Sequence, residues 1–178
     1  MSRQAVRETS EVVGVGELKY VIHEAPAWRS VANYLAMADL APFGFVGMQE
    51  QIWLRSLPAV GFEICCIPFR VYGITLGDVV ELDSDGKRII DVRVKGGHRA
   101  FRVFFSPTPS SSELEIVRDR IHEIANSDDL LVEWSGDRHV AVDVSPTHDI
   151  ERLWQEIQPE VRNGSALWEW GDAEPFRT

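Results

Sequence analysis

The hydrophobic pattern of the chain changes its period near residue 106. Before this point, short apolar runs are separated by turn residues, and several runs alternate apolar and polar positions, as strands with one buried face do. After it, two segments carry apolar residues three and four positions apart, which is the spacing of amphipathic helices. The sequence therefore predicts an α+β protein with a strand-rich first part and a mixed second part.

Residues 11–98 are predicted to form a small β-barrel or sheet lobe. The most apolar stretch, Phe62–Glu81, has the pattern of a strand, a turn containing Gly73 and Gly77, and a second strand. The strands expected in this lobe are residues 50–57, 62–67, 79–82 and 88–95. Their short turns, with no long helix between them, favour a barrel or an open sheet.

Local spacing predicts which side chains of this part are buried. Residues 27–38 are expected to form a short amphipathic helix or a coil, because helical spacing relates Trp28, Val31, Leu35 and Ala38. The strand at residues 88–95 alternates, and its expected core positions are Ile90, Val92 and Val94. The strand at residues 99–105 also alternates, with Arg102 on its outward face.

Residues 99–171 are predicted to form a ferredoxin-like lobe with the element order βαββαβ. Its strands are expected at residues 99–105, 130–134, 139–144 and 166–170. The first helix has the pattern of a capping box at Ser112 and Glu115, and the second helix is expected to start at Ser145 and Pro146. A flexible tail is expected at each end, over residues 1–10 and 172–178.

The net charge of −10 lies entirely in the second part of the chain. Residues 1–105 hold twelve acidic and twelve basic residues, whereas residues 106–178 hold sixteen acidic and six basic ones. This balance argues against a general binder of nucleic acid or anionic membrane, because both carry negative charge. It permits a basic protein partner, and the candidate contact residues on the first helix are Glu113, Glu115, Asp119 and Glu123. Solvated helix faces that simply collect acidic residues are the alternative reading of the same pattern.

Neither a membrane segment nor a metal site is predicted. The first ten residues lack the apolar segment of a signal peptide, and no apolar run approaches the roughly 20 residues of a membrane span, so a soluble, cytoplasmic protein is expected. The two cysteines, Cys65 and Cys66, are adjacent and are expected to be small buried hydrophobes, with a strained vicinal disulfide or a reactive thiol pair as the alternative. None of the five histidines has metal-ligand spacing, so no metal or cofactor is expected.

No catalytic residue is assigned from the sequence. An alternative reading places His98 and Asp78, as catalytic candidates, in a cleft between the lobes, where Arg93, Arg102 and His98 would bind an anionic ligand. His98 follows the Gly96–Gly97 turn inside a run of basic residues, which is why it is the most suggestive histidine. Asp78 could equally serve as a turn-stabilising residue, since its side chain can accept nearby backbone N–H groups.

Several motifs, taken in order, resemble those of the DUF4265 proteins, a bacterial family of unknown function. They cover roughly residues 20–171 and are His23-x-x-Pro-x-Trp28-Arg29, Glu50-Gln-x-Trp53, Phe62-Glu-Ile-Cys-Cys-Ile-Pro-Phe69, Leu76-Gly-Asp-Val-Val80 and Trp168-Glu-Trp170. Two departures are Gly97-His98, where a Ser-Gly type of turn is common, and Asp172 after Gly171. The resemblance implies a bacterial origin and one compact unit, and it supplies no catalytic residue.

The first functional hypothesis is therefore a non-catalytic acidic binding protein, of the immunity or antitoxin type, that neutralises a basic protein. The second is an enzyme or small-molecule binder that holds an anionic ligand between the lobes. A third hypothesis is a regulatory or dimerising ferredoxin-like module. Charge asymmetry favours the first, because complementary charge speeds the encounter of two proteins.

Overall fold

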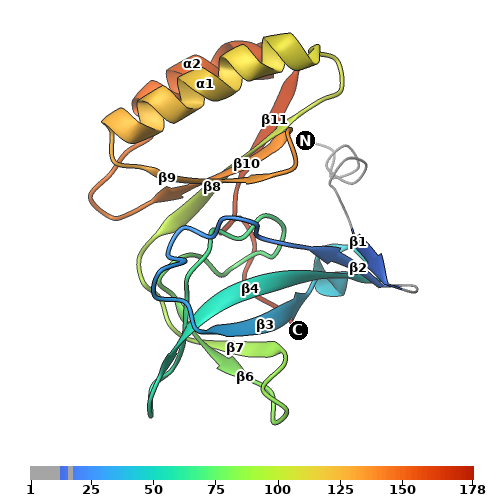
Figure 1. Cartoon of the computed structure of the whole chain (residues 1–178), viewed down its shortest axis with the longest axis vertical. Helices are drawn as coiled ribbons and strands as arrows, with labels where there is room; N and C mark the ends of the chain where they lie inside the picture. The colour runs from blue at the N-terminus through green and yellow to red at the C-terminus, as the bar shows by residue number, and fades with distance from the viewer. Residues whose placement is uncertain (1–12, 16–17) are drawn as a thin grey trace.

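The seven N-terminal strands form one curled sheet, which together with the segments packed on it is here called the first lobe. The computed structural model describes residues 13–15 and 18–178, and it confirms a mixed α+β fold with two sheets and two α-helices (Figure 1). The strands of the first lobe are β1 (Val13–Val15), β2 (Leu18–Val21), β3 (Tyr34–Asp39), β4 (Met48–Leu57), β5 (Gly61–Ile64), β6 (Val79–Leu82) and β7 (Ile89–Val94).

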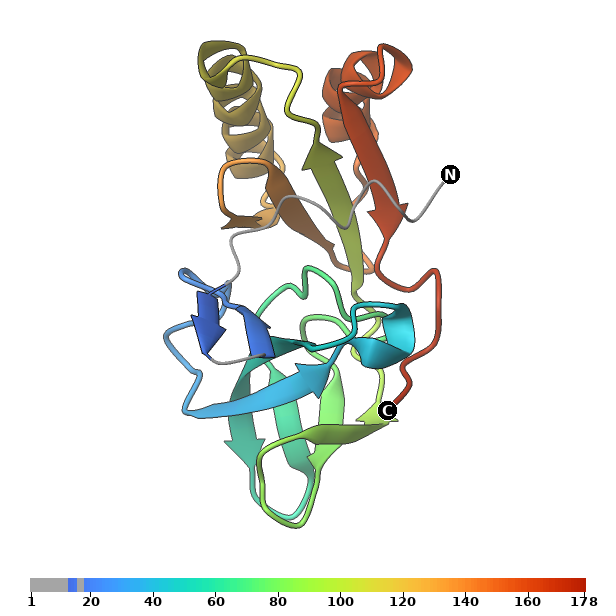
Figure 2. The ribbon, with the colours of Figure 1, turned by 90° about the vertical axis from the view of Figure 1, so that its right-hand side faces the viewer.

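This sheet is open and does not close into a barrel. Its strand order is β1-β2-β4-β5-β6-β7, and β3 pairs with the other side of β4. Between β3 and the start of β7 there is one isolated bridge, Met37 to Arg88, so the sheet curls (Figure 2) without forming a continuous ladder there. Of the two predicted forms of this lobe, the sheet is correct and the barrel is wrong.

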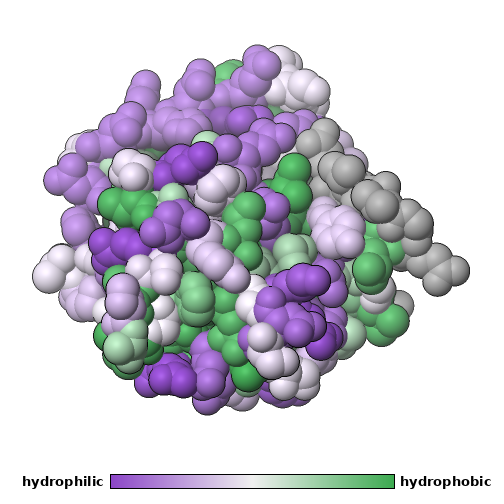
Figure 3. Space-filling model, turned by 60° about the horizontal axis from the view of Figure 1, so that its bottom comes forward, coloured by the Kyte–Doolittle hydropathy of each residue, from purple (hydrophilic) through white to green (hydrophobic). Residues whose placement is uncertain are grey.

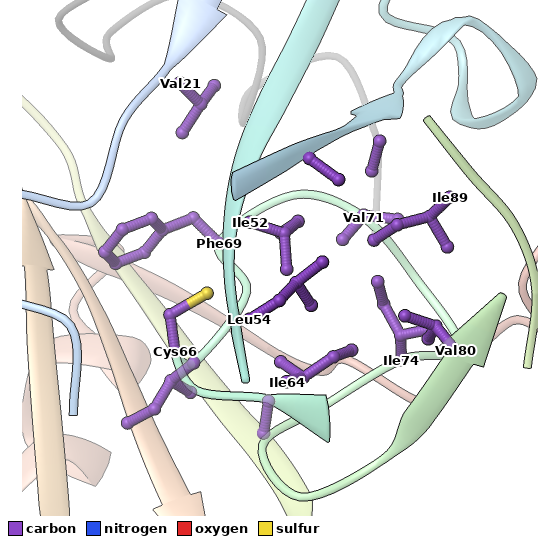
Figure 4. Close-up of a cluster of buried hydrophobic side chains, with 14 of the residues drawn as sticks. Val21, Ile52, Leu54, Ile64, Cys66, Phe69, Val71, Ile74, Val80 and Ile89 are labelled. Atoms are coloured by element: carbon purple, nitrogen blue, oxygen red, sulfur yellow. The ribbon is translucent and has the colours of Figure 1, made fainter. Parts of the chain in front are cut away.

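The core of the first lobe lies between the sheet and an apolar segment that crosses it. Ile52 and Leu54 of β4 point inward and belong to the same buried cluster as Val80 of β6 (Figure 4). Residues 65–76 lie against these side chains although they contain no helix or strand. A buried segment without regular secondary structure must pair its backbone N–H groups with partners outside a ladder.

The helix predicted at residues 27–38 is not present, and the alternative prediction of a coil holds only for residues 27–33. Residues 27–31 form a turn, and β3 follows with Ala36 and Ala38 buried while Leu35 is 43% exposed. The burial therefore alternates with a period of two, because β3 pairs with β4 over six residues. This pairing overrides the helical spacing of the apolar residues.

The burial predicted for β7 is correct at one position of three. Val92 packs on the core, but Ile90 and Val94 are 43% and 53% exposed, and Ile89 is buried instead. The register between β6 and β7 shifts twice, between Val79 and Val80 and between Glu81 and Leu82. Each shift adds a residue to one strand and interrupts the alternation on which the prediction depended.

The second lobe contains a four-stranded antiparallel sheet with both α-helices on one face. The strands are β8 (Arg99–Phe105), β9 (Leu131–Ser135), β10 (His139–Val144) and β11 (Ala166–Trp170), in the order β11-β8-β10-β9. Helices α1 (Ser111–Ser127) and α2 (Glu151–Arg162) cover the face that points away from the first lobe (Figure 1). None of the helices in the described residues is long and apolar enough to cross a membrane.

Both helix starts differ from the prediction. In α1 the capping box is Ser110 with Glu113, since the Ser110 side chain accepts from the Glu113 N–H and the Glu113 carboxylate accepts from the Ser110 N–H. The predicted pair was two residues too far along the chain. Helix α2 starts at Glu151 without a side-chain cap, so Ser145 and Pro146 lie in the preceding turn.

The segment after β11 returns to the first lobe. The Gly73 N–H donates to the Gly171 carbonyl over 2.9 Å, and Phe176 packs against the first core (Figure 2). Residues 172–178, predicted as a tail, thus form a strap across the two lobes. The other predicted tail, residues 1–10, lies outside the described residues.

Candidate functional site

The sheet of the second lobe has one apolar face and one polar face, and the polar face is buried against the first lobe. Phe101, Val103 and Phe105 of β8 pack with the helices. The alternate positions on the four strands carry five buried or half-buried charged or titratable side chains, namely Arg102, Glu133, His139, Asp143 and Glu169. Arg102 is only 1% exposed, so the outward position predicted for it lies at an interface between lobes and not in solvent.

At the centre of this interface, a histidine lies between two carboxylates from different lobes. The Nδ1 atom of His23 is 2.5 Å from the Oε2 atom of Glu133 on β9, and its Nε2 atom is 3.1 Å from the Oε1 atom of Glu50 on β4. All three residues are buried. Phe69 stacks on the imidazole with ring centroids 4.5 Å apart.

The same carboxylates accept the backbone N–H groups of the irregular segment in the core. Glu50 accepts from Phe69, Arg70 and Val71 over 2.5, 2.9 and 2.8 Å. Glu133 accepts from Ile67 over 2.7 Å and from Ala27 over 2.8 Å. With both imidazole nitrogens engaged and no solvent access, the cluster holds the lobes together and has no open position for a substrate.

The charge state of this cluster follows from its surroundings. Burial acts to lower the pKa of His23, but Cys66, Glu133 and Glu50 together outweigh burial and raise that pKa well above 6.5. Burial acts to raise the pKa of Glu50, and the hydrogen bond and charge of His23 lower it overall. An imidazolium between carboxylates is therefore the stable form. Burial raises the pKa of the Cys66 thiol.

A second set of polar contacts lies beside the first. A guanidinium nitrogen of Arg102 donates to the carbonyl of Val71, and its Nη1 atom is 3.4 Å from the Glu169 carboxylate. The Tyr72 hydroxyl donates to the same carboxylate over 2.5 Å. Together with the histidine cluster, these contacts fix residues 67–73 between the two sheets.

The residues of the alternative catalytic reading do not meet in one cleft. His98 binds Asp143 and not Asp78, with its Nδ1 atom 2.9 and 2.8 Å from the two carboxylate oxygens. Asp78 accepts from the Thr75 and Gly96 N–H groups and from Lys95, as a turn-stabilising residue does. Arg93 pairs with Glu81 over 2.8 Å on an exposed surface. Arg102, in contrast, is buried and contacts other residues.

The His98–Asp143 pair is a partly exposed titratable pair that joins the two lobes. The His98 side chain is 19% exposed and meets the edge of Trp28, with ring centroids 6.0 Å apart. Burial raises the pKa of Asp143. Among the described residues, no serine or cysteine forms a hydrogen bond with His98, and no group of three or more His, Cys, Asp or Glu could hold a metal ion.

The acidic residues predicted to bind a partner all lie exposed on α1, but they differ in their partners. Glu113 is engaged in the capping box. Glu115 and Asp119 form no ion pair with any residue that the structure describes. Glu123 lies close enough to Arg120 to help raise the pKa of its guanidinium, although the main cause is Glu156.

A surface hollow in the first lobe contains little chemistry. It has a volume of about 540 Å³ and lies between the β4–β5 and β6–β7 hairpins. Its lining includes the apolar side chains of Leu57, Phe62 and Leu82 and the Arg93–Glu81 ion pair. Figure 3 shows the underside of the molecule, on which apolar and polar side chains are interspersed. The hollow brings together no histidine or cysteine from the described residues.

The buried cluster was missed in the sequence, although the pattern contained a signal for one member. Glu50 shares the alternation of Ile52 and Leu54, so the period-two rule that would place those two in the core also places Glu50 there. A charged residue at a core position requires a partner. The identity of that partner, His23, depends on a contact that no spacing encodes.

A fall in pH below about 6.5 is expected to destabilise the protein through His139. Burial first, and then the charges of Arg70 and Arg102, hold the pKa of His139 well below 6.5. Near pH 6.5, His139 therefore binds a proton in the unfolded state but not in the folded state. The free energy of unfolding falls as pH falls. The raised pKa of His23 acts oppositely: its contribution is complete below pH 6.5 and is lost as pH rises through the folded-state pKa.

Urea denaturation from pH 5 to 9 measures both effects. His139→Phe should flatten the stability profile between pH 5 and 6.5 and leave the alkaline side unchanged. An unchanged acid slope in this variant would show that His139 is not responsible.

Comparison with known proteins supports one family and one similar fold. The chain matches the family model described as a domain of unknown function, DUF4265, over residues 50–170. It is similar to a solved structure titled "Novel crystal structure of a hypothetical protein from Neisseria gonorrhoeae", with a TM-score of 0.59 and 12% identity over 82% of this chain and 99% of that chain. No curated protein matches. Because the family model covers more than half of the sequence, the chain belongs to the DUF4265 family.

Proposed function

We propose that this protein is a non-catalytic binding protein that recognises a basic protein partner through the acidic outer face of α1. The observation that carries the proposal is the pair Glu115 and Asp119, which are exposed one helical turn apart and have no ion-pair partner among the described residues. Residues four apart lie on the same side of a helix. Glu123 extends this acidic face by one further turn.

The surrounding charges support the same proposal. Of the arginines on or beside α1, Arg120 pairs with Glu156 over 2.9 Å and Arg152 pairs with Asp128. The Arg118 guanidinium lies over the Trp134 ring and donates to the Asp137 carbonyl. Residues 99–171 hold fourteen acidic and seven basic residues, which leaves this lobe with a large negative charge. Such a surface accelerates association with a basic partner and gives it a strong salt dependence.

The second lobe provides a rigid support for this face. We infer that it is a ferredoxin-like module, since its elements follow the order βαββαβ and both helices pack on one face of the sheet. Leu114, Ile121 and Ala125 fix α1 against that sheet, so the acidic side chains are presented from a helix whose position is set by packing.

Charge reversal of the acidic face is expected to reduce partner capture at least about tenfold, because close charge pairs across an interface contribute on the order of 1.5 kcal/mol or more each. The test is a pull-down from lysate of the source organism with Glu115→Lys, Asp119→Lys and Glu123→Lys combined, quantified by mass spectrometry. The matched control reverses three exposed acids of the first lobe, Glu24→Lys, Asp85→Lys and Asp91→Lys.

Loss of one basic protein in the α1 variant, with retention in the control, would support the proposal. Equal capture by both variants would reject it. In the narrower form of the proposal, the partner is a toxin and this chain is its immunity protein. Co-expression should then rescue growth with the parent chain and fail to do so with the α1 variant.

A further inference from the structure

A hollow in the second lobe, here called the helix-end hollow, lies between the start of α1 and the end of α2. It has a volume of about 270 Å³. Its lining includes Glu113 and Val117 of α1, Glu160 of α2, and Thr108 and Pro109 of the linker that precedes α1. Sites for small molecules usually have volumes of about 300–1,000 Å³, so the helix-end hollow suits a single long side chain better than a cofactor.

The lining of this hollow carries two carboxylates and no basic side chain. The Oε2 atom of Glu113 accepts from the N–H and hydroxyl groups of Ser110, and the Oε2 atom of Glu160 accepts from the Asn163 side chain over 3.4 Å. Among the described residues, neither glutamate forms an ion pair, and neither Oε1 atom accepts a hydrogen bond. Both carboxylates therefore retain an oxygen that can accept from an occupant.

Other charges around the helix-end hollow do not neutralise the two acids. The positive N-terminal end of α1 is already met by the capping carboxylate of Glu113, and the negative C-terminal end of α2 lies at Asn163. Arg138 donates to two carbonyl groups of the linker, and Arg162 is exposed and lies outside the lining. The hollow therefore favours a positively charged occupant.

We infer that the helix-end hollow binds the arginine side chain of a partner protein. A guanidinium carries five N–H donors in a planar fork, so it can donate to carboxylates on two helices at once, whereas an ammonium is a compact and strongly hydrated charge. Its weakly hydrated face can lie against Pro109 and Val117, which are both half-buried. Free arginine fits less well, because the lining holds no basic group for its α-carboxylate.

This site is separate from the acidic outer face of α1. Glu113 precedes Glu115 by two residues, which places the two side chains about 200° apart around the helix axis. The other carboxylate of the hollow, Glu160, belongs to α2. The inference therefore does not depend on binding through Glu115 and Asp119, and the two surfaces can be tested separately.

An NMR titration of the isotope-labelled full chain with N-acetylarginine methylamide tests the site. Saturable shifts are expected at the side-chain amide of Asn163 and at the backbone amides of Thr108 and Ser165, which all line the hollow. The neutral analogue N-acetylcitrulline methylamide should give no saturable shift. The corresponding capped lysine should bind at least about threefold more weakly than the capped arginine.

Glu160→Gln is the diagnostic variant, because it removes one charge and keeps the size of a side chain on the protein surface. It should weaken binding of the capped arginine about fivefold, as the loss of a partly exposed ion pair does. Glu151→Gln, exposed at the start of the same helix, is the matched control and should leave the affinity unchanged.

The absence of saturable shifts at the three amides would overturn the inference, as would equal binding of the citrulline or lysine compound. Unchanged affinity in Glu160→Gln would also overturn it. Shifts confined to Glu115 and Asp119 would reject the helix-end hollow and leave the proposed function of the acidic outer face intact.

Discussion

Replacing Glu50 with alanine is expected to reduce the free energy of unfolding by about 3–5 kcal/mol, the cost of removing one partner from a buried ion pair. Glu50 is fully buried, and its carboxylate accepts from three backbone N–H groups and from His23. Its loss leaves an imidazolium and the N–H groups of Phe69, Arg70 and Val71 without their acceptor. Urea denaturation at pH 7 measures the change.

Two further variants separate the acceptor role of Glu50 from the loss of volume. Each carboxylate oxygen of Glu50 accepts from two donors in the parent protein. Glu50→Gln keeps the shape of the side chain but replaces one of these oxygens with an NH₂ group, which would face two donors and accept from neither. We therefore expect Glu50→Gln to remain strongly destabilising. Glu81→Ala removes an exposed ion pair with Arg93 and should cost no more than about 1 kcal/mol. Similar costs for Glu50→Ala and Glu81→Ala would contradict the role of the cluster.

The strands of the second lobe were predictable because each has a clean alternation between turn signals. The predicted and observed bounds agree for β8, β10 and β11, and for β6 in the first lobe. In these strands one face meets a single apolar core, so the pattern of the residues determines the burial of that face. The same rule failed for β7, where two register shifts interrupt the alternation.

The polar face of the second sheet shows what alternation cannot reveal. Arg102, Glu133 and Glu169 follow the pattern of a strand face exposed to water, yet Arg102 and Glu133 are buried against the other lobe. A solvated face and a face paired with the backbone of another segment have the same sequence pattern, since both need polar side chains. The Glu133–Ile67 hydrogen bond joins residues 66 positions apart in the sequence, and the Arg102–Val71 hydrogen bond joins residues 31 positions apart.

This difference also explains why the candidate sites were assigned unequally well. The acids of α1 were predicted as exposed, and the helical spacing that predicts the buried stripe also predicts the opposite face. The cluster of His23, Glu50 and Glu133 joins two strands and an irregular segment that are distant in sequence. The cluster can be recognised only when the packing of the two sheets is known, because the pattern of apolar and polar residues along one strand does not say which faces pack together.

Gly73→Ala is expected to release the C-terminal strap and reduce the free energy of unfolding by about 3–4 kcal/mol, from a left-handed backbone penalty and the lost burial of Phe176. Gly73 has a φ of +73°, and a Cβ atom there would lie 1.9 Å from the backbone nitrogen of Phe176. Backbone cannot yield as a flexible side chain can, so residues 175–178 must move away. Released residues should also become sensitive to carboxypeptidase.

Gly164→Ala is the matched control for this substitution. Its φ is +82°, but no atom lies within 4 Å of the added Cβ, so it should cost only the left-handed penalty of about 1–2 kcal/mol. Deleting residues 175–178 should reduce the cost of Gly73→Ala to that of the control, because the obstructing backbone is then gone. If Gly73→Ala costs no more than Gly164→Ala in the full chain, the strap does not pack on Gly73 in solution, and the polar contacts at the interface hold the two lobes together without it.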